Sequence, residues 1–154
     1  MKSFQMSVDK QALLNAANEV LTVKLSDIQV ELDGLDKSLK NETKSSAGDK
    51  YETSREMIQQ EREKLYELQA NTKRMLDLLS ASKEKTPTIV ETGALVQTDK
   101  ALLHISVPLG KISSGQTIAF FISPSSPLAQ VMLNKKVNDI VSFNGVSHNI
   151  IAIS

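Results

Sequence analysis

Two carboxylates stand three positions apart near residue 50, Asp49 and Glu52, directly after Gly48. Mg²⁺ is usually held by one or two carboxylates together with phosphate and water oxygens, so this pair could complete the oxygen shell of a metal ion. On the sequence alone a structural interpretation comes first, because glycine suits the left-handed position that ends a helix and Asp49 with Glu52 resembles an acidic capping box. The two interpretations are compatible, since a cap can present its free oxygens outward.

The segments that would position this pair carry the heptad spacing of a coiled coil. Before Gly48 one row is Leu14, Leu21, Ile28 and Leu35, and the other is Asn18, Leu25, Leu32 and Leu39. After Gly48 one row is Tyr51, Ile58, Leu65, Thr72 and Leu79, and the other is Ser54, Glu61, Leu68 and Met75. The rows mirror each other about the midpoint between Gly48 and Asp49. This symmetry predicts one antiparallel hairpin over residues 8–79 and a monomer rather than a parallel dimer, with arms about 50 Å long at ~1.5 Å per residue.

The composition excludes several classes of protein. The 18 basic and 18 acidic residues cancel, so no overall charge indicates a polyanion-wrapping protein. There is no cysteine, the first ten residues lack the apolar core of a signal peptide, and no apolar run approaches the roughly 20 residues of a membrane span. We therefore expect a cytoplasmic protein without a membrane partner.

Charge also divides the chain. Residues 1–85 hold 14 of the 18 basic and 15 of the 18 acidic side chains. The polar segment Ala81–Thr88 lacks periodicity and contains a proline, which disfavours helix at the residue before it. We predict a hairpin domain at 1–80 with an acidic tip near 48–52, a linker at 81–92 and a second domain at 93–154.

Short period-two stretches predict antiparallel strands in the second domain, so the fold class is α+β. They fall at 95–97, at 103–109, and at 118–122 after a turn at Lys111–Gly115. Ser126 before Pro127 has the chemistry of an N-cap followed by proline at the first helical position, which predicts a short helix ending at Asn134. Asn144-Gly145 predicts a two-residue hairpin between the last strands.

Two motifs carry a resemblance to the bacterial GreA/GreB transcript cleavage factors. The stretch 122–136, ISPSSPLAQVMLNKK, followed by Asp139-Ile140-Val141, is similar to the C-terminal signature of that family, with Asn134 in place of a glycine. Gly48, Asp49 and Glu52 match its G-D-x-x-E tip between two coiled-coil helices. Domain order, hairpin length and total length agree, so the resemblance covers nearly the whole chain.

The resemblance implies an accessory factor, not an enzyme in its own right. The C-terminal domain would be FKBP-like and would dock on RNA polymerase, with Ser125, Ser126, Pro127 and Leu128 as binding residues. The hairpin would enter the secondary channel, where Asp49 and Glu52 would help hold Mg²⁺ shared with the polymerase, so that the polymerase cleaves backtracked RNA. No cofactor or metal site of its own is implied.

Basic side chains near the tip, Lys50, Arg55 and Arg62, could steer the phosphates of the nascent RNA. The simpler interpretation is a solvated helix surface with intrahelical charge pairs. Family members continue after the glutamate as Asn-Ala-Glu-Tyr, whereas this chain has Thr53-Ser54-Arg55-Glu56. That difference leaves open a secondary-channel regulator without cleavage activity.

Two further alternatives come from other classes of protein. A structural coiled-coil adaptor would use the hairpin alone. A prolyl isomerase would need an aromatic-lined pocket, for which only Phe120, Phe121 and Phe143 are present in the C-terminal part. His104 and His148 lie in separate predicted strands without cysteine or carboxylate neighbours, so we interpret them as sheet positions rather than as a metal pair.

Overall fold

The computed structural model describes residues 8–44 and 49–154, with side chains for all of these except 42–44 and 49–51. The chain forms two compact units. One comprises Val20–Leu76, and the other comprises Asp77–Ser154 together with the N-terminal residues through Glu19. The start of the first long helix, through Glu19, and the end of the second, from Asp77, therefore belong to the unit that holds the sheet.

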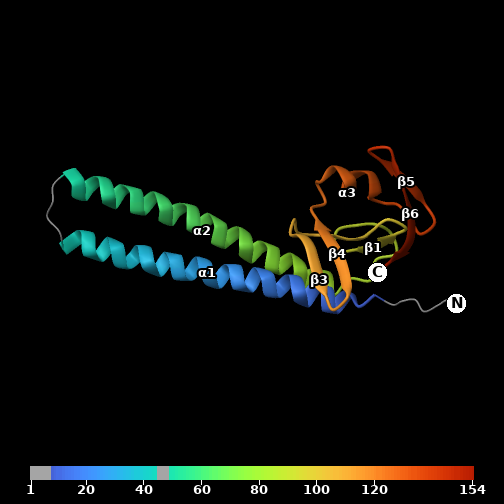
Figure 1. Cartoon of the computed structure of the whole chain (residues 1–154), viewed down its shortest axis with the longest axis horizontal. Helices are drawn as coiled ribbons and strands as arrows, with labels where there is room; N and C mark the ends of the chain where they lie inside the picture. The colour runs from blue at the N-terminus through green and yellow to red at the C-terminus, as the bar shows by residue number, and fades with distance from the viewer. Residues whose placement is uncertain (1–7, 45–48) are drawn as a thin grey trace. The chain divides into compact units, whose positions relative to one another are not determined.

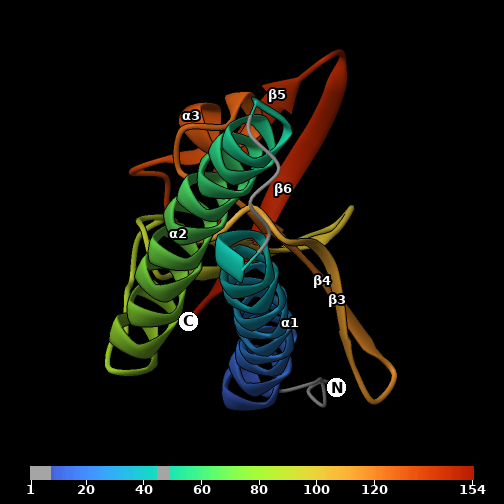
Figure 2. The ribbon, with the colours of Figure 1, turned by 90° about the vertical axis from the view of Figure 1, so that its left-hand side faces the viewer.

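The two long helices are α1 (Lys10–Lys44) and α2 (Asp49–Lys83), which lie side by side (Figures 1 and 2). Asp9 caps α1, because its carboxylate accepts the backbone N–H of Ala12 at 3.1 Å and its carbonyl accepts that of Leu13. The α2 helix closes with tight turns in which the N–H groups of Glu84 and Lys85 donate to carbonyls three residues back. The predicted helical hairpin is confirmed.

Burial follows the predicted seam. Seam positions that are fully or almost fully buried are Leu14, Leu21, Ile28, Leu32, Leu65, Thr72 and Leu79. In the unit Val20–Leu76, Ile28, Leu32 and Leu65 form one apolar cluster with Leu35 packed on it. Toward the tip the seam loses its buried residues, since Glu61 is exposed and Ile58 is only half-buried. Heptad apolar residues thus hold the two helices together through the middle of the unit.

One expected boundary differs from the structure. The α2 helix continues through Lys83, three residues into the segment interpreted as a linker. Ser82 explains the extension, because it is 1 % exposed and its hydroxyl donates to the carbonyl of Leu78 at 2.9 Å. A polar residue whose hydroxyl is satisfied inside the helix can occupy a buried last turn.

The sheet has six strands in the order β3-β4-β2-β1-β6-β5. The strands are β1 (Leu95–Thr98), β2 (Leu102–Ile105), β3 (Gly110–Ser114), β4 (Thr117–Ile122), β5 (Ile140–Phe143) and β6 (Val146–Ile153) (Figure 1). A short helix, α3 (Pro127–Met132), lies between β4 and β5 in the chain. The α+β class with a helical hairpin, a sheet and one short helix is confirmed.

Both faces of the sheet carry buried residues. One face contributes to a core of nine buried residues that includes Ala129 and Met132 of α3: Val90, Ala94, Val96, Leu103, Ile105, Ala129, Met132, Val141 and Ile150. On the other face the pairing register places Leu95, His104 and Phe121 in a row across β1, β2 and β4. These three side chains are at most 2 % exposed.

Three features of the sheet differ from the prediction. The β2–β4 pair is parallel, so the sheet is mixed rather than wholly antiparallel. The segment expected as a turn at Lys111–Gly115 forms most of β3, and only Gly115, with a φ of +61°, keeps the turn. The second predicted strand stops at Ile105, whose N–H and carbonyl bond to Ala94 and Gly93 just before β1.

Other predicted details are confirmed. Ser126 is the N-cap of α3 and Pro127 is its first residue, and Asn134 just beyond the helix takes the left-handed φ of +70°. Asn144 and Gly145 both have positive φ between β5 and β6, as a two-residue hairpin turn requires.

Candidate functional site

The predicted acidic tip falls where the two long helices meet. Asp49 is the first residue of α2, and Glu52 lies in the first turn with an exposed side chain. Gly48 and the turn before it lie outside the described residues, as do the side chains of Asp49 and Lys50. The backbone thus starts a helix at Asp49, where carboxylates are favoured by the positive end of the helix dipole.

Polar contacts between the two arms fix how the helices align. The amide of Gln69 donates to the side-chain oxygen of Gln29 at 3.3 Å, and Arg62 Nε lies 3.3 Å from a carboxylate oxygen of Asp36. The two pairs are mirror images about Asp49, within half a residue of the symmetry point expected from the seam. These polar pairs therefore have the same helix register as the apolar seam.

Arg62 is engaged in the hairpin rather than turned free toward solvent. Its guanidinium carbon lies 5.8 Å from the centroid of the Tyr66 ring, and its Nε is buried beside Asp36 without an aligned hydrogen bond. A shallow hollow of about 220 Å³ beside it is lined by Gln59, Arg62, Glu63 and Tyr66. These contacts give Arg62 a structural role, and its predicted contact with RNA stays a prediction, as do those of Lys50 and of the half-buried Arg55.

The serine-rich segment before α3 is held together by several internal hydrogen bonds. The hydroxyl of Ser126 donates to the carbonyl of Ser123 at 2.7 Å and accepts the N–H of Ala129. The Oγ atoms of Ser123 and Ser125 lie 2.8 Å apart, and the side-chain amide of Gln130 donates to the carbonyl of Pro124. Internal hydrogen bonds therefore set the shape of this loop before any partner binds.

The four residues predicted for polymerase docking differ in exposure. Ser125 and Pro127 are exposed, Ser126 is half-buried as the N-cap, and Leu128 packs against the core of the sheet unit. Only Ser125 and Pro127 thus present most of their side chains to a partner. Their contact with a polymerase stays a prediction.

The histidines and the phenylalanines among the described residues form no common site. His104 stacks on Phe121 with ring centroids 4.8 Å apart, and its Nδ1 lies 2.6 Å from Ser106 Oγ. Phe120 is exposed on the opposite face of β4, and Phe143 lies in β5 at the far edge of the sheet. Phe120, Phe121 and Phe143 therefore do not line one common pocket.

His104 is a neutral core residue. Burial, and secondly the charge of Lys10, lowers the pKa of His104 to about 4. Its Nε2 is buried without a hydrogen-bond partner among the described residues. Within residues 8–44 and 49–154 no group of three histidine, aspartate or glutamate side chains is placed to hold a metal ion, and no helix is long and apolar enough to cross a membrane.

Sequence reasoning missed a lysine-lined hollow in the unit that holds the sheet. Its lining residues come from positions 10–11, 83, 85–87 and 153–154. The only signal in the sequence was the pair Lys83 and Lys85 in the segment interpreted as a linker. Nothing in the sequence brings residue 10 to these lysines, because that proximity depends on how both helix ends join the sheet unit.

Comparisons with known proteins add a likeness to solved structures. No family model and no curated protein matches the chain. Among solved structures, the chain is similar to that of the transcription factor Gfh1, at 18 % sequence identity and a TM-score of 0.36. The alignment covers 90 % of this chain and 93 % of the Gfh1 chain. At that identity and score the likeness assigns neither a family nor an activity.

Proposed function

We propose that this chain is an accessory factor of RNA polymerase that inserts its hairpin tip into the secondary channel and stimulates cleavage of backtracked RNA by the polymerase. The observation that supports this best is the hairpin itself. Two helices of 35 residues each follow one another in the chain, and Asp49 and Glu52 occupy the first turn of the second, α2. Together with the resemblance of both motifs to the transcript cleavage factors, this arrangement fits a narrow probe with carboxylates at its end.

The arms are suited to hold such a tip at a fixed distance. At about 1.5 Å per residue each helix is about 50 Å long. The apolar cluster around Leu32 and Leu65 and the Gln29–Gln69 contact keep the helices in one register. A slip of one helix against the other would break these contacts together, so Asp49 and Glu52 stay at the end of the hairpin.

The chemistry assigned to the tip is modest. The carboxylates of Asp49 and Glu52 would supply oxygen ligands to a Mg²⁺ ion at the polymerase active site, which is a shell that two carboxylates can complete with phosphate and water. The metal would polarise the scissile phosphate and its attacking water, as in two-metal hydrolysis. The factor contributes ligands and their placement, and the polymerase contributes the rest of the active site.

The loop before α3 would supply the docking contact. Its hydrogen bonds among Ser123, Ser125 and Ser126 hold Pro127 exposed at the start of a helix. A preformed surface loses little conformational entropy on binding, which favours recognition by such a short segment. Docking through this loop would leave the hairpin available for the channel.

The decisive experiment measures RNA cleavage in polymerase complexes stalled after backtracking. Wild-type protein should accelerate cleavage, and the isosteric double variant Asp49→Asn, Glu52→Gln should lose the stimulation while still competing with wild type for the polymerase. Glu67→Gln, which changes an exposed carboxylate elsewhere on α2, is the matched control and should keep full activity.

The other outcomes identify the alternatives. Binding to the polymerase without stimulated cleavage, by wild type and variant alike, would identify a regulator without cleavage activity, the alternative that the Thr53-Ser54-Arg55-Glu56 sequence after the carboxylates leaves open. Failure of wild type to bind any polymerase would reject the proposal and favour a structural adaptor.

A further inference from the structure

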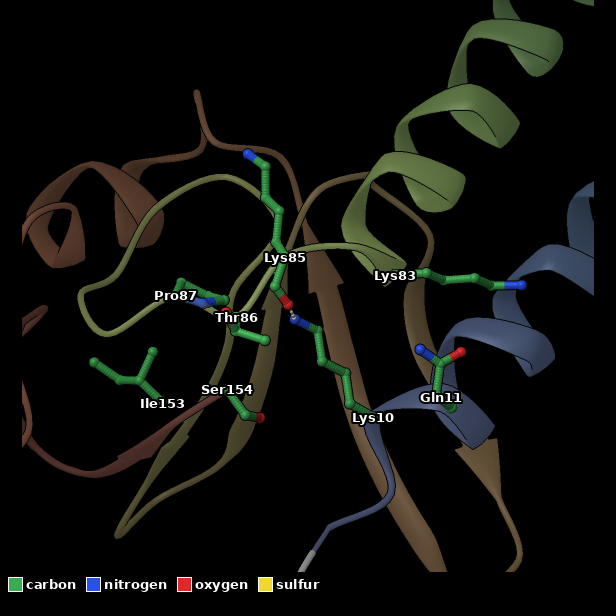
Figure 3. Close-up of a pocket in the computed structure, with 8 residues that line it drawn as sticks. All are labelled: Lys10, Gln11, Lys83, Lys85, Thr86, Pro87, Ile153 and Ser154. Atoms are coloured by element: carbon green, nitrogen blue, oxygen red, sulfur yellow. Dashed lines mark hydrogen bonds between the residues drawn. The ribbon is translucent and has the colours of Figure 1, made fainter.

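The lysine-lined hollow lies within the unit that holds the sheet and has a volume of about 390 Å³. Three lysines, one side-chain amide, two hydroxyl residues and two apolar residues line it: Lys10, Gln11, Lys83, Lys85, Thr86, Pro87, Ile153 and Ser154 (Figure 3). Its volume is near the lower end of the range for ligand pockets, about 300–1,000 Å³. A ligand no larger than a mononucleotide would fit.

The lysines of this hollow come from different segments of the chain. Figure 3 shows Lys10 rising from α1 to the backbone of Lys85, where its ammonium donates to the Lys85 carbonyl at 3.3 Å. Lys83 extends from the end of α2 with its ammonium directed away from that of Lys10, and both side chains are half-buried. The ammonium of Lys85 points away from them and donates to the carbonyl of Thr92. Lys10 therefore presents its ammonium to the hollow, and Lys83 would reach a ligand there once its flexible side chain turns toward Lys10.

No side-chain carboxylate of the described residues pairs with these lysines. Among the described residues, no carboxylate oxygen lies within ion-pair distance of Lys10, Lys83 or Lys85. Asp9 is next to Lys10 in sequence but caps α1 through Ala12, and Glu84 is exposed and does not line the hollow. Burial, and secondly the charge of Lys85, lowers the pKa of Lys10, as expected for an ammonium that lacks an anionic partner.

The remaining lining suits a compact anion with an apolar portion. Gln11 and Thr86 can donate hydrogen bonds to phosphate oxygens, and the half-buried Pro87 and Ile153 offer apolar surface beside them. The backbone of Ser154 is paired with Leu95 through two hydrogen bonds of 2.8 and 2.9 Å, so this side of the hollow is fixed by the sheet. Phosphate groups are bound by such combinations of ammonium groups and neutral donors.

We infer that this hollow is a binding site for a small phosphate-bearing anion, bound by Lys10 and by Lys83 after its flexible side chain turns inward. The site is separate from the carboxylates at residues 49–52, and the inference does not rest on the proposed function. Because its lining comes from the start of α1, the end of α2 and the end of β6, a bound anion would cross-link these three segments.

Calorimetric titration tests the site directly, with inorganic phosphate, pyrophosphate and adenosine monophosphate as separate probes at constant ionic strength. Pyrophosphate should bind saturably, and Lys10→Met and Lys83→Met should each weaken it about tenfold, the loss expected for one charge-assisted hydrogen bond. Tighter binding of the nucleotide than of phosphate would identify a contact of Pro87 and Ile153 with the base. Equal affinity would identify recognition of the phosphate alone, and both results support the site.

Lys73→Met is the matched control, because Lys73 is an exposed lysine on α2 that does not line the hollow. It should bind pyrophosphate as wild type does. Circular dichroism of each variant separates lost binding from lost folding. Absence of saturable binding to all three probes, or equal affinity of the folded Lys10→Met and Lys83→Met variants and wild type, would overturn the inference.

A second measurement does not depend on variants. The charge of Lys10 contributes to the lowered pKa of His104, so an anion bound to Lys10 should move the pKa of His104 upward. Imidazole signals followed by NMR over a pH series, with and without saturating pyrophosphate, would report this change. An unmoved His104 titration in the presence of saturating pyrophosphate would place the anion elsewhere and refute the assignment to Lys10.

Discussion

The unit Val20–Leu76 and the unit that holds the sheet are stabilised in different ways. In the first, a cluster of three buried residues, Ile28, Leu32 and Leu65, is supplemented by polar contacts between helices such as Asp36 with Arg62. In the second, nine buried residues form one core, and a second buried row runs across the other face of the sheet. The helical unit has a narrow apolar seam, whereas the sheet unit has a larger core that several strands share.

This difference indicates where each unit can tolerate change. A seam is a series of local contacts, so losing one of them opens the helices nearby and leaves distant turns paired. A core is shared, so a cavity in it weakens every strand that packs on it. We expect substitutions in the sheet unit to act globally and those in the helical unit to act locally.

The largest effect should follow Phe121→Ala in the sheet unit. Phe121 is 1 % exposed and stacked on His104, so its removal leaves a cavity and should cost about 3–5 kcal/mol of unfolding free energy. Urea unfolding followed by circular dichroism measures the loss. Ile118→Ala, at a 44 % exposed position on the same strand, is the control and should cost far less. Equal losses of unfolding free energy for both variants would contradict a shared core in the sheet unit.

Acid should weaken the sheet unit by a nearly comparable amount. The pKa of His104 is about 4 in the folded protein, against an ordinary value of 6.5, so the unfolded chain binds the proton more readily. Stability from this group is complete above pH 6.5 and falls as the pH drops toward 4, by about 3 kcal/mol at pH 4. Unfolding free energies measured across this range would show the slope.

The double variant His104→Phe, Ser106→Ala isolates the histidine from carboxylates that also titrate in acid. It removes both partners of the 2.6 Å contact, so no buried polar group is left alone. The difference between wild type and variant should change by about 3 kcal/mol between pH 6.5 and 4. A difference that stays constant with pH would show that His104 is not the source.

A smaller and local effect should follow Leu65→Ala in the helical unit. Leu65 is 8 % exposed in the seam cluster, which places the expected loss near the lower limit for such changes, about 2–3 kcal/mol. Hydrogen exchange read by mass spectrometry should accelerate in peptides covering residues 24–41 and 52–72 and stay unchanged in β1, β2 and β4. Acceleration in the strands as well would show that the two units unfold together.

The smallest effect should be a gain. Thr72 is fully buried in the seam, and its hydroxyl donates back to the carbonyl of Leu68 at 2.7 Å. Thr72→Val keeps the shape and removes a buried polar group together with a bond that slightly disturbs the helix, so the helical unit should gain about 0.5–1 kcal/mol. Slower hydrogen exchange around residues 68–76 would confirm the gain, and faster exchange would show that the hydroxyl stabilises the seam.

Repetition explains why the hairpin could be predicted from the sequence. Heptad rows state both which face is buried and, by their mirror symmetry, which residues face each other, so the spacing alone is enough to pair Leu32 with Leu65. Asn144-Gly145 and Ser126-Pro127 were equally informative, because each pair has backbone preferences that suit one local geometry.

The missed features depend on contacts between distant segments. Ser82 looks like a linker residue until its burial is known, and Lys111–Gly115 looks like a turn until β4 pairs with it. The parallel β2–β4 pair follows from the order of strands in the sheet, which alternation does not encode. The lysine hollow was missed for the same reason, since its lining residues are far apart in sequence.

The mirror symmetry of the hairpin also makes its length adjustable. Because pairs such as Gln29 with Gln69 are set only by their equal distance from the turn, deleting one heptad from each helix at mirror positions would return all remaining seam residues to matching partners. Each such step changes the length of the hairpin by about 10 Å. Insertions or deletions of whole heptads that keep this symmetry would therefore change how far the hairpin reaches without changing the residues at its end.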